Sequence, residues 1–294
     1  MRSGMEGEYN NLIKLISLDL DGTLLNTERR MPERNRSAIQ LATQKDIEII
    51  ISTGSPYELM PHDDLRGLNI SYAITANGSA IYEYKTGKCI YEDSIDTKTI
   101  IPILKFLLTK DMHLDMFIEG KGYCPNNTKA IVNHLNVPKA RKNYILNNRV
   151  WLEDPLEYIE ENQLTMQKIT MNFYPSETGV LVDRKEVKEY LENNPKIRLV
   201  SGGWGNLELT KRGVDKGKAL KILCKRLEIS LGDTIAIGDS INDLDIIKAA
   251  GIGVAMKNAM PEVLDAADYV TGTNDACGVA EAMEHFMSMN RIVL

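Results

Sequence analysis

The segment KLISLDLDGTLL, residues 14–25, decides how the rest of this chain is interpreted. Its apolar first half is typical of a short strand buried on both faces of a sheet. The strand is expected to end at Asp19-Leu20-Asp21-Gly22-Thr23, where two carboxylates need a cation or hydrogen bonds to compensate their charge. Gly22 permits a sharp turn in which successive amides converge on one anion. Carboxylates beside such amides indicate a magnesium-dependent phosphate site.

Two simpler interpretations of this motif exist. Asp-x-Asp-Gly also begins calcium-binding loops, but an EF-hand loop counted from Asp19 needs a glutamate where Arg30 stands. A plain exit from a strand into a turn, where Asp and Gly are common, needs no ligand at all. The motif alone leaves this second interpretation open, so the remainder of the chain has to decide.

The composition is that of an ordinary globular protein, with 43% hydrophobic and 26% charged residues among 294. This length predicts two domains. The net charge of −6 argues against nucleic acid as a partner, although a local positive pocket can still bind a small anion. No segment approaches the ~18 consecutive apolar residues of a membrane helix, so no membrane partner is expected.

The cysteines and the start of the chain favour a cytoplasmic location. The four cysteines are widely spaced and contain no CxxC pair, which is typical of reduced, buried thiols. The polar opening MRSGMEGEYNN lacks an apolar core, so we interpret it as a frayed terminus and not as a signal peptide.

Both ends of the chain show an alternation of strands and helices. This rhythm predicts a parallel sheet with right-handed crossovers, in which ligands collect at the carboxyl ends of the strands. After the first strand we expect a helix over residues 32–45, strands over 46–54 and 72–76, a helix after Asp215, and strands over 234–238, 252–256 and 269–271.

The middle of the chain has a different pattern. Hairpins mixed with helices favour an inserted α+β domain. We expect hairpins over residues 80–92 and 197–209, helices over 97–110 and 182–192, strands near 113–118 and 166–174, and a loop over the Asn-rich residues 143–153. The predicted domains are a core of residues 1–84 and 211–294 and an insert of residues 85–210.

Polar side chains recur where the predicted core strands end or core helices begin, namely Asp19 and Asp21, Thr53, Lys216, and Asp239, Asn242 and Asp243. Magnesium prefers hard oxygen ligands, for which Asp19 and Asp239 are natural candidates. Lys216 offsets repulsion among the acids and attracts phosphate. Each group alone has a simpler explanation as a turn or a cap. Their joint occurrence, in order, at strand exits and helix starts favours the phosphate site.

The chain resembles the haloacid dehalogenase superfamily, and within it the Cof-type, sugar-phosphatase-like branch with a type IIB α/β cap. The resemblance is carried by DLDGTLL (19–25), STG (52–54), ITANGSAIY (74–82), GVDKGKAL (213–220), GDSINDLDIIKAAG (238–251) and GVAMKNAMPEVLDAADYVT (253–271). These segments cover both core regions almost completely, whereas the insert matches only in length and pattern. The implied fold is α/β, a Rossmann-like core with an inserted α+β cap that sets substrate specificity.

The resemblance also implies a magnesium-dependent phosphoric monoester hydrolase. Asp19 would be the nucleophile that forms an aspartyl-phosphate, and Asp21 the general acid and base. The metal would be held by Asp19, the main-chain carbonyl of Asp21 and Asp239. We assign Asp243 to the same metal site, where it suits the orientation of other groups better than direct metal binding.

The remaining implied roles concern the phosphoryl group and the substrate. Thr53 and Lys216 would act in catalysis by binding the phosphoryl oxygens, whose developing charge such sites stabilise. The substrate-binding residues would be Gly22, Gly54, Asn77, Asn242 and Asn258.

Two positions depart from the family pattern. Ser55 stands where the family usually has arginine after the Thr-Gly pair, so a planar cation with several donors is lost there. Lys257 stands where glycine is frequent and adds positive charge at the rim. In the insert, we expect packed or surface roles for the candidates His113, Tyr123, His134 and Trp204.

The favoured prediction is an enzyme, a monomer or homodimer, that hydrolyses small phosphate monoesters such as sugar phosphates. A phosphotransferase or mutase on the same core is the first alternative. A phospho-accepting regulatory module is a second, which Asp21 and the large insert disfavour. A catalytically silent binding protein is a third, which the retained acids disfavour. Loops near residues 94–97 and 211–213 are the expected hinges of a mobile lid.

Overall fold

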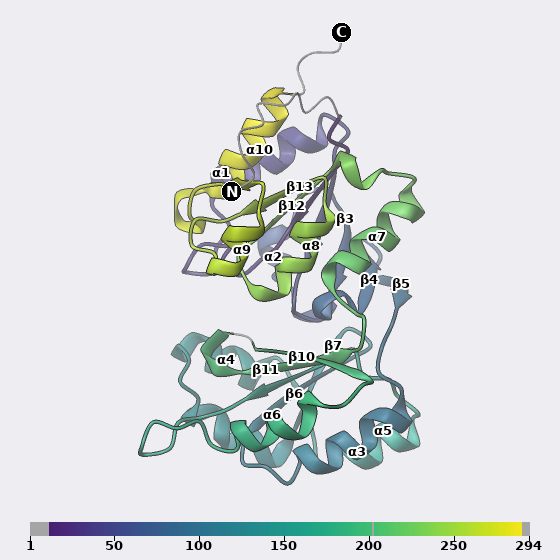
Figure 1. Ribbon diagram of the computed structural model, residues 1–294, viewed down its shortest axis with the longest axis vertical. Coiled ribbons are helices and arrows are strands. Elements are labelled where there is room, and N and C mark those ends of the chain that lie inside the picture. The colour runs from purple at the N-terminus through teal and green to yellow at the C-terminus, as the bar shows by residue number, and fades with distance from the viewer. Residues whose placement is uncertain (1–11, 202, 290–294) are drawn as a thin grey trace.

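The computed structural model describes residues 12–201 and 203–289, so the predicted frayed start and Gly202 lie outside the described residues. Two lobes are stacked along the long axis of the molecule (Figure 1). Both ends of the chain build one lobe, the core, and the middle of the chain builds the other, the cap. No helix in the described ranges has the length and apolar character needed to cross a membrane.

The core contains an eight-stranded sheet in the order β14-β13-β12-β1-β2-β3-β4-β5. The first six strands in this order are parallel, and β4 and β5 complete the sheet as an antiparallel hairpin. The strands are β1 (Leu15–Leu18), β2 (Glu48–Ser52), β3 (Ile70–Thr75), β4 (Ala80–Glu83), β5 (Lys88–Glu92), β12 (Thr234–Gly238), β13 (Ile252–Ala255) and β14 (Tyr269–Val270). The predicted parallel sheet from both chain ends is confirmed.

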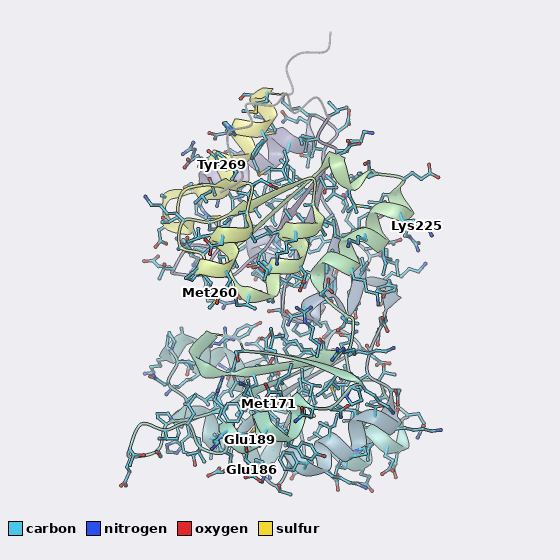
Figure 2. The ribbon with its side chains drawn as sticks, viewed as in Figure 1. Met171, Glu186, Glu189, Lys225, Met260 and Tyr269 are labelled. Carbon is cyan, nitrogen blue, oxygen red and sulfur yellow. The ribbon has the colours of Figure 1, made fainter. Side chains whose placement is uncertain are left out.

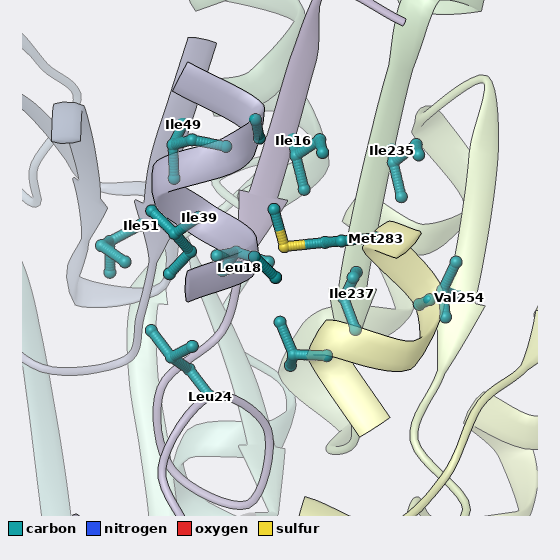
Figure 3. Close-up of a cluster of buried hydrophobic side chains, with 14 of the residues drawn as sticks. Ile16, Leu18, Leu24, Ile39, Ile49, Ile51, Ile235, Ile237, Val254 and Met283 are labelled. Atoms are coloured by element: carbon teal, nitrogen blue, oxygen red, sulfur yellow. The ribbon is translucent and has the colours of Figure 1, made fainter. Parts of the chain in front are cut away.

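Helices cover both faces of the core sheet, which explains the unbroken apolar runs of its strands. The core helices are α1 (Glu33–Thr43), α2 (His62–Leu65), α7 (Lys216–Leu227), α8 (Leu244–Ala249), α9 (Pro261–Ala266) and α10 (Gly278–Met289). Ile49 and Ile51 of β2 pack with α1 and α10, whereas Ile50 packs with α7 on the other face. Figure 3 shows the first of these clusters, with Ile39 of α1 and Met283 of α10 over the central strands.

The cap contains a six-stranded sheet in the order β10-β11-β9-β6-β7-β8, antiparallel except for the β7–β8 pair. Its strands are β6 (His113–Ile118), β7 (Lys121–Pro125), β8 (Val150–Leu152), β9 (Lys168–Asn172), β10 (Ile197–Ser201) and β11 (Leu207–Lys211). Its helices are α3 (Thr97–Leu107), α4 (Lys139–Asn147), α5 (Pro155–Glu161) and α6 (Arg184–Glu192). Helices α3, α5 and α6 lie on the side of the cap sheet remote from the core (Figure 1).

The two faces of the cap sheet differ in chemistry because side chains alternate along a strand. Ile169 and Met171 of β9 belong to the apolar cluster under the helices, whereas Lys168 and Thr170 line a cavity toward the core. Figure 2 shows Met171 in the cap lobe and Met260 at the edge of the core lobe that faces the cap. A polar face of the cap therefore covers the core.

The chain crosses between the lobes twice, after β5 and after β11. The Asp93 carboxylate accepts hydrogen bonds from the ammonium groups of Lys211 at 2.6 Å and Lys218 at 2.9 Å, so the two crossings are tied to each other. The predicted hinge loops coincide with these crossings. Their motion stays a prediction.

Two predictions about organisation are wrong. Ile81 of β4 lies opposite Tyr91 of β5, so the core sheet extends to Glu92, beyond the predicted boundary after residue 84, and β11 keeps Lys211 in the cap. A hairpin pattern does not reveal which sheet the hairpin joins. Residues 143–153, predicted as a loop, contain the end of α4 and all of β8, because buried Ile145 packs with Val132 and Leu135 despite the polar composition.

Candidate functional site

The site lies at the carboxyl ends of three neighbouring parallel strands, where ligands of such sheets bind. Asp19 follows β1, Thr53 follows β2 and Asp239 follows β12. The backbone N–H of Asp19 donates to the carbonyl of Ile237 at 3.0 Å, which continues the β1–β12 pairing to the end of both strands. Strand register therefore brings together residues that are 220 positions apart.

Three carboxylates meet at this point. One oxygen from each of Asp19, Asp239 and Asp243 lies within 4.8 Å of the others. Burial raises the pKa of Asp19 well above its ordinary value, and the neighbouring Asp243 raises it further, although Lys216 lowers it. Burial and Asp243 likewise raise the pKa of Asp239 to about 6. A hard divalent cation would relieve this repulsion, so the donor set fits Mg²⁺.

Lys216 begins α7 and is fully buried. Its ammonium group donates to Asp19 Oδ1 at 2.8 Å, to Asp243 Oδ1 at 2.6 Å and to the Ser52 carbonyl at 2.9 Å. Burial lowers the pKa of Lys216, but the two carboxylates outweigh burial and leave that pKa above its ordinary value. Lys216 is thus the partner of the acids, as predicted from the sequence.

Asp243 holds its neighbours in place. Its Oδ2 accepts hydrogen bonds from the backbone N–H groups of Asp239 at 3.1 Å and Ser240 at 3.0 Å, while its Oδ1 binds Lys216. Asp239 accepts from the Thr23 hydroxyl at 3.0 Å and the Ser240 hydroxyl at 3.1 Å. These contacts are those of an orienting residue, as expected for Asp243.

Gly22 allows the turn after β1 to pass close to the acids. Its φ is +82°, and a β-carbon at this position would lie 2.5 Å from Asp239 Oδ2. The Asn258 side chain donates to the Gly22 carbonyl at 2.8 Å and accepts from the Asn274 N–H at 3.0 Å. Asn258, predicted to bind substrate, makes these contacts to the turn and does not line the described cavity.

Asp21 lies at the entrance of the site. Its side chain is 45% exposed and forms an ion pair with Arg29, Nη1 to Oδ1, at 2.9 Å. Arg29 has a φ of +58° in the loop before α1. Arg29 could not be predicted from the sequence, since an arginine in a loop belongs to no periodic pattern.

The remaining predicted residues gather beside the end of β2. The Thr53 hydroxyl accepts from the Ser55 N–H at 3.1 Å, which leaves its proton available to a ligand. The Asn242 amide donates to Asn77 Oδ1 at 3.0 Å. A β-carbon at Gly54 would lie 2.8 Å from that same Asn77 oxygen, so only glycine fits without a shift. Asn242 Oδ1 is buried and has no hydrogen-bond partner among the described residues.

Two cap residues reach this cluster. The Lys168 ammonium donates to Glu208 Oε1 at 2.8 Å, and Glu208 Oε2 accepts from the Asn77 amide at 2.6 Å. A β-carbon at Gly54 would lie 3.2 Å from Lys168 Nζ. Burial raises the pKa of Glu208, but Lys168 and Asn77 outweigh burial and leave it below its ordinary value. A charged pair of the cap thus contacts the core beside the predicted phosphate-binding turn.

A cavity of about 230 Å³ lies between the lobes. Its core side includes Asp19, Asp21 and Thr53, and its cap side includes Arg149 and Lys168. Asp19, Asp21, the Thr53 hydroxyl and the cap cations therefore face one shared cavity. Such an arrangement can hold a small anion against a nucleophile while limiting access of water.

The cap candidates from the sequence lie elsewhere. His113 is buried and contacts Cys124 and Asn172. Tyr123 packs near Tyr158, and His134 is exposed. The Trp204 side chain lies outside the described part of the chain. Lys168 was missed, although polar residues at every second position of β9 could have indicated it. Arg149 has no such signal, because it lies in a predicted loop.

Comparison with known proteins gives a consistent result. The profile of the haloacid dehalogenase-like hydrolase family matches residues 16–283. Phosphatase YwpJ of Bacillus subtilis is 32% identical, with 94% of this chain and 100% of the relative covered. The 5-amino-6-(5-phospho-D-ribitylamino)uracil phosphatase YcsE of the same organism is also 32% identical, with 94% and 96% covered. The solved structure of the subclass IIB sugar phosphatase BT4131 superposes with a TM-score of 0.75 at 26% identity, with 93% and 99% covered.

Proposed function

We propose that this chain, which belongs to the haloacid dehalogenase-like hydrolases and is a Cof-type phosphatase, hydrolyses small phosphate monoesters. The reaction would proceed through an aspartyl-phosphate on Asp19, with Mg²⁺ as the cofactor. Sugar phosphates and related phosphorylated metabolites are the proposed substrates. The relatives named as a sugar phosphatase and as a ribitylaminouracil phosphate phosphatase support this class.

The observation that carries the proposal is the setting of Asp19. Lys216 binds one carboxylate oxygen of Asp19, and no hydrogen bond from within residues 12–201 and 203–289 reaches the other oxygen. A carboxylate that is fixed through one oxygen, and whose second oxygen can approach a cavity, is what a nucleophile requires. Asp19 also lines the cavity itself.

The donor set supports the cofactor. Asp19, the main-chain carbonyl of Asp21 and Asp239 would hold Mg²⁺, with Asp243 orienting the site through Lys216 and two backbone amides. When bound, the ion supplies positive charge that neutralises the phosphoryl oxygens.

The protein groups carry out two displacements. In the first, an oxygen of Asp19 bonds to phosphorus, the ester P–O bond breaks, and Asp21 gives its proton to the departing alcohol. In the second, water attacks phosphorus, Asp21 takes a proton from that water, and the bond to Asp19 breaks to release inorganic phosphate. The Thr53 hydroxyl lines the cavity and would donate to a phosphoryl oxygen. Lys216 does not line the described cavity, and its ammonium group would act through Asp19, whose charge it offsets. Asp21 must leave Arg29 to act.

The test is a panel of phosphorylated metabolites with Mg²⁺, scored by released phosphate. Intact-mass measurement after acid quenching follows the enzyme itself. Asp21→Asn should lose most turnover, because both displacements need its proton transfer, whereas Asp19→Asn should release no phosphate and gain no mass. Turnover by Asp19→Asn would refute the nucleophile. Phosphate transferred to an added sugar, without release, would instead identify a phosphotransferase.

Partners and location stay predictions: a small phosphorylated metabolite, no nucleic acid, no membrane, a monomer or homodimer, and the cytoplasm. The four cysteines are free, as a reducing compartment would require. We expect the cap to set the substrate specificity.

A further inference from the structure

The cap side of the cavity is basic. Arg141 of α4, Arg149 before β8 and Lys168 of β9 line it, and Arg29 of the core lies at its edge. Three carboxylates line the same cavity, and two of these, Asp19 and Asp21, belong to the proposed reaction centre and not to the cap. Among the described residues of the cap, three cationic side chains therefore line this wall of the cavity against one carboxylate, that of Glu208.

The two carboxylates that pair with the cations of this wall are already engaged. Asp115 receives two hydrogen bonds from Arg149, from Nε at 2.7 Å and from Nη2 at 2.8 Å. Glu208 receives hydrogen bonds from Lys168 and Asn77. A sugar hydroxyl that donated to either carboxylate would have to compete with a buried ion pair, so the wall is poorly suited to bind a neutral polyol.

Donors of the same wall remain available. A guanidinium group has five N–H donors, and an ammonium group has three. Arg149 directs Nε and Nη2 to Asp115 and Nη1 to the Asn148 carbonyl at 3.2 Å, which accounts for three of its five N–H donors within the described ranges. Lys168 uses one of its three, on Glu208. The wall can thus donate hydrogen bonds more readily than it can accept them.

Tyr144 fixes the positions of these cations. Its ring centroid lies 5.4 Å from Arg149 Cζ and 5.6 Å from Arg29 Cζ, one from the cap and one from the core. Its hydroxyl donates to the Leu59 carbonyl of the core at 2.6 Å. Burial lowers the pKa of Arg141, while the charge of Asp21 raises it and that of Arg29 lowers it.

We propose that this basic wall, formed by Arg141, Arg149 and Arg29 around Tyr144, binds a second anionic group on the alcohol portion of the phosphate ester. The proposal depends on the proposed hydrolase function and specifies its substrate class: phosphate monoesters that carry a carboxylate or a further phosphate. Guanidinium groups match the planar, paired oxygens of such anions. The cavity of about 230 Å³ limits these substrates to small metabolites.

Matched substrate pairs test the proposal. Glucose 6-phosphate is compared with 6-phosphogluconate, glycerol 3-phosphate with 3-phosphoglycerate, and fructose 6-phosphate with fructose 1,6-bisphosphate. We expect kcat/KM to be higher by about tenfold or more for the anionic member, since one charge-assisted hydrogen bond is worth that factor. Equal kcat/KM within all pairs would overturn the proposal.

Variants locate the effect. Arg141→Gln, and Arg149→Lys, which keeps a charge beside Asp115, should lower kcat/KM more for the anionic member than for the neutral member of each pair. Lys139→Gln is the control, because Lys139 is exposed on the same helix and does not line the cavity. A preference that survives both arginine changes would contradict the assignment of the wall.

Binding separates this inference from the hydrolase function. Calorimetric titration of Asp19→Asn with the same pairs measures affinity without turnover. Tighter binding of the anionic members would support the basic wall whether or not the wild type releases phosphate. Failure of the wild type to release phosphate would refute only the proposed hydrolysis. Equal affinity within each pair would refute the wall.

Discussion

Arg29 forms an ion pair with Asp21 at 2.9 Å and also packs against the ring of Tyr144 in the cap. One arginine of the core thus contacts both the proposed acid and the lobe above it. The Asp21 carboxylate must leave its ion pair with Arg29 before it can transfer a proton. Because Arg29 also contacts the cap, we expect the position of the cap to influence this release. This link is open to mutational tests.

Replacing Arg29 with glutamine should affect activity more than stability. Both side chains of the pair are more than 40% exposed, so its loss should change the free energy of unfolding by less than about 1 kcal/mol. We expect kcat/KM for a doubly anionic ester to fall about tenfold. Arg34→Gln removes an equally exposed ion pair, with Glu284, far from the site and should leave activity intact. Equal kinetics for the two variants would exclude a role for Arg29.

Replacing Lys216 with methionine should destabilise the fold and abolish turnover. The change leaves Asp19 and Asp243 buried without their shared cation, which should cost about 3–5 kcal/mol in urea unfolding. Adding Asp243→Asn should recover part of that loss in stability but no activity. Lys218→Met, which breaks a partly exposed pair with Asp93, should cost much less, about 1 kcal/mol. A similar cost for both lysines would disprove the buried network.

Replacing Gly22 with alanine should impair metal binding as well as stability. The left-handed φ alone should cost about 1–3 kcal/mol. The added β-carbon would also displace the Asp239 carboxylate. Gly67→Ala is the matched control, since its φ of +81° is nearly the same and no atom lies within 4 Å of the added carbon. The difference in Mg²⁺ affinity between the two variants measures the contact with Asp239, and no difference would refute it.

Removing the Asp239 carboxylate should separate metal binding from folding. Asp239→Asn relieves repulsion among three acids, so without Mg²⁺ the variant should melt no lower than the wild type. Mg²⁺ at a hundredfold excess over Kd should raise the Tm of the wild type by about 5 °C and that of the variant much less. Equal shifts in both proteins would place the ion elsewhere, and Asp265→Asn, at an exposed position of α9, serves as the surface control.

Acidification should weaken the cap through His113. Burial lowers the pKa of His113 to about 4, while an unfolded histidine titrates near 6.5. Between these values the unfolded chain binds a proton that the folded chain excludes, so the free energy of unfolding should fall by up to about 3 kcal/mol as pH drops from 6.5 to 4. His113→Gln should flatten this slope in urea titrations, and exposed His134→Gln should not. If the free energy of unfolding of His113→Gln depended on pH as steeply as that of the wild type, His113 would be excluded as the cause of the loss.

Much of the core site could be predicted from the sequence because its groups are fixed by local structure. Asp19 and Thr53 each follow an apolar strand directly, and Lys216 follows the helix cap Asp215. Parallel strand order then brings them together without any knowledge of distant contacts.

The cap wall could not be predicted in the same way. Arg149 is held at the cavity by its ion pair with Asp115 of β6, which is distant in the sequence. It also follows α4, a helix that the polar composition of this segment did not indicate. Lys168 was placed on a strand, but which face of a sheet covers the core depends on tertiary packing. The boundary after residue 84 failed for the same reason, since β5 joins its sheet by pairing.

Both passages of the chain between the lobes lie at one edge of the molecule, on the side opposite α4 in Figure 1, and Asp93 fastens one to the other. Because the cap is attached to the core along this one edge, we expect it to open at the opposite edge. The phosphate ester would therefore enter beside α4 and meet the arginines before it meets the nucleophile. Substrates would therefore be selected by their charge at this entrance, before the chemical step.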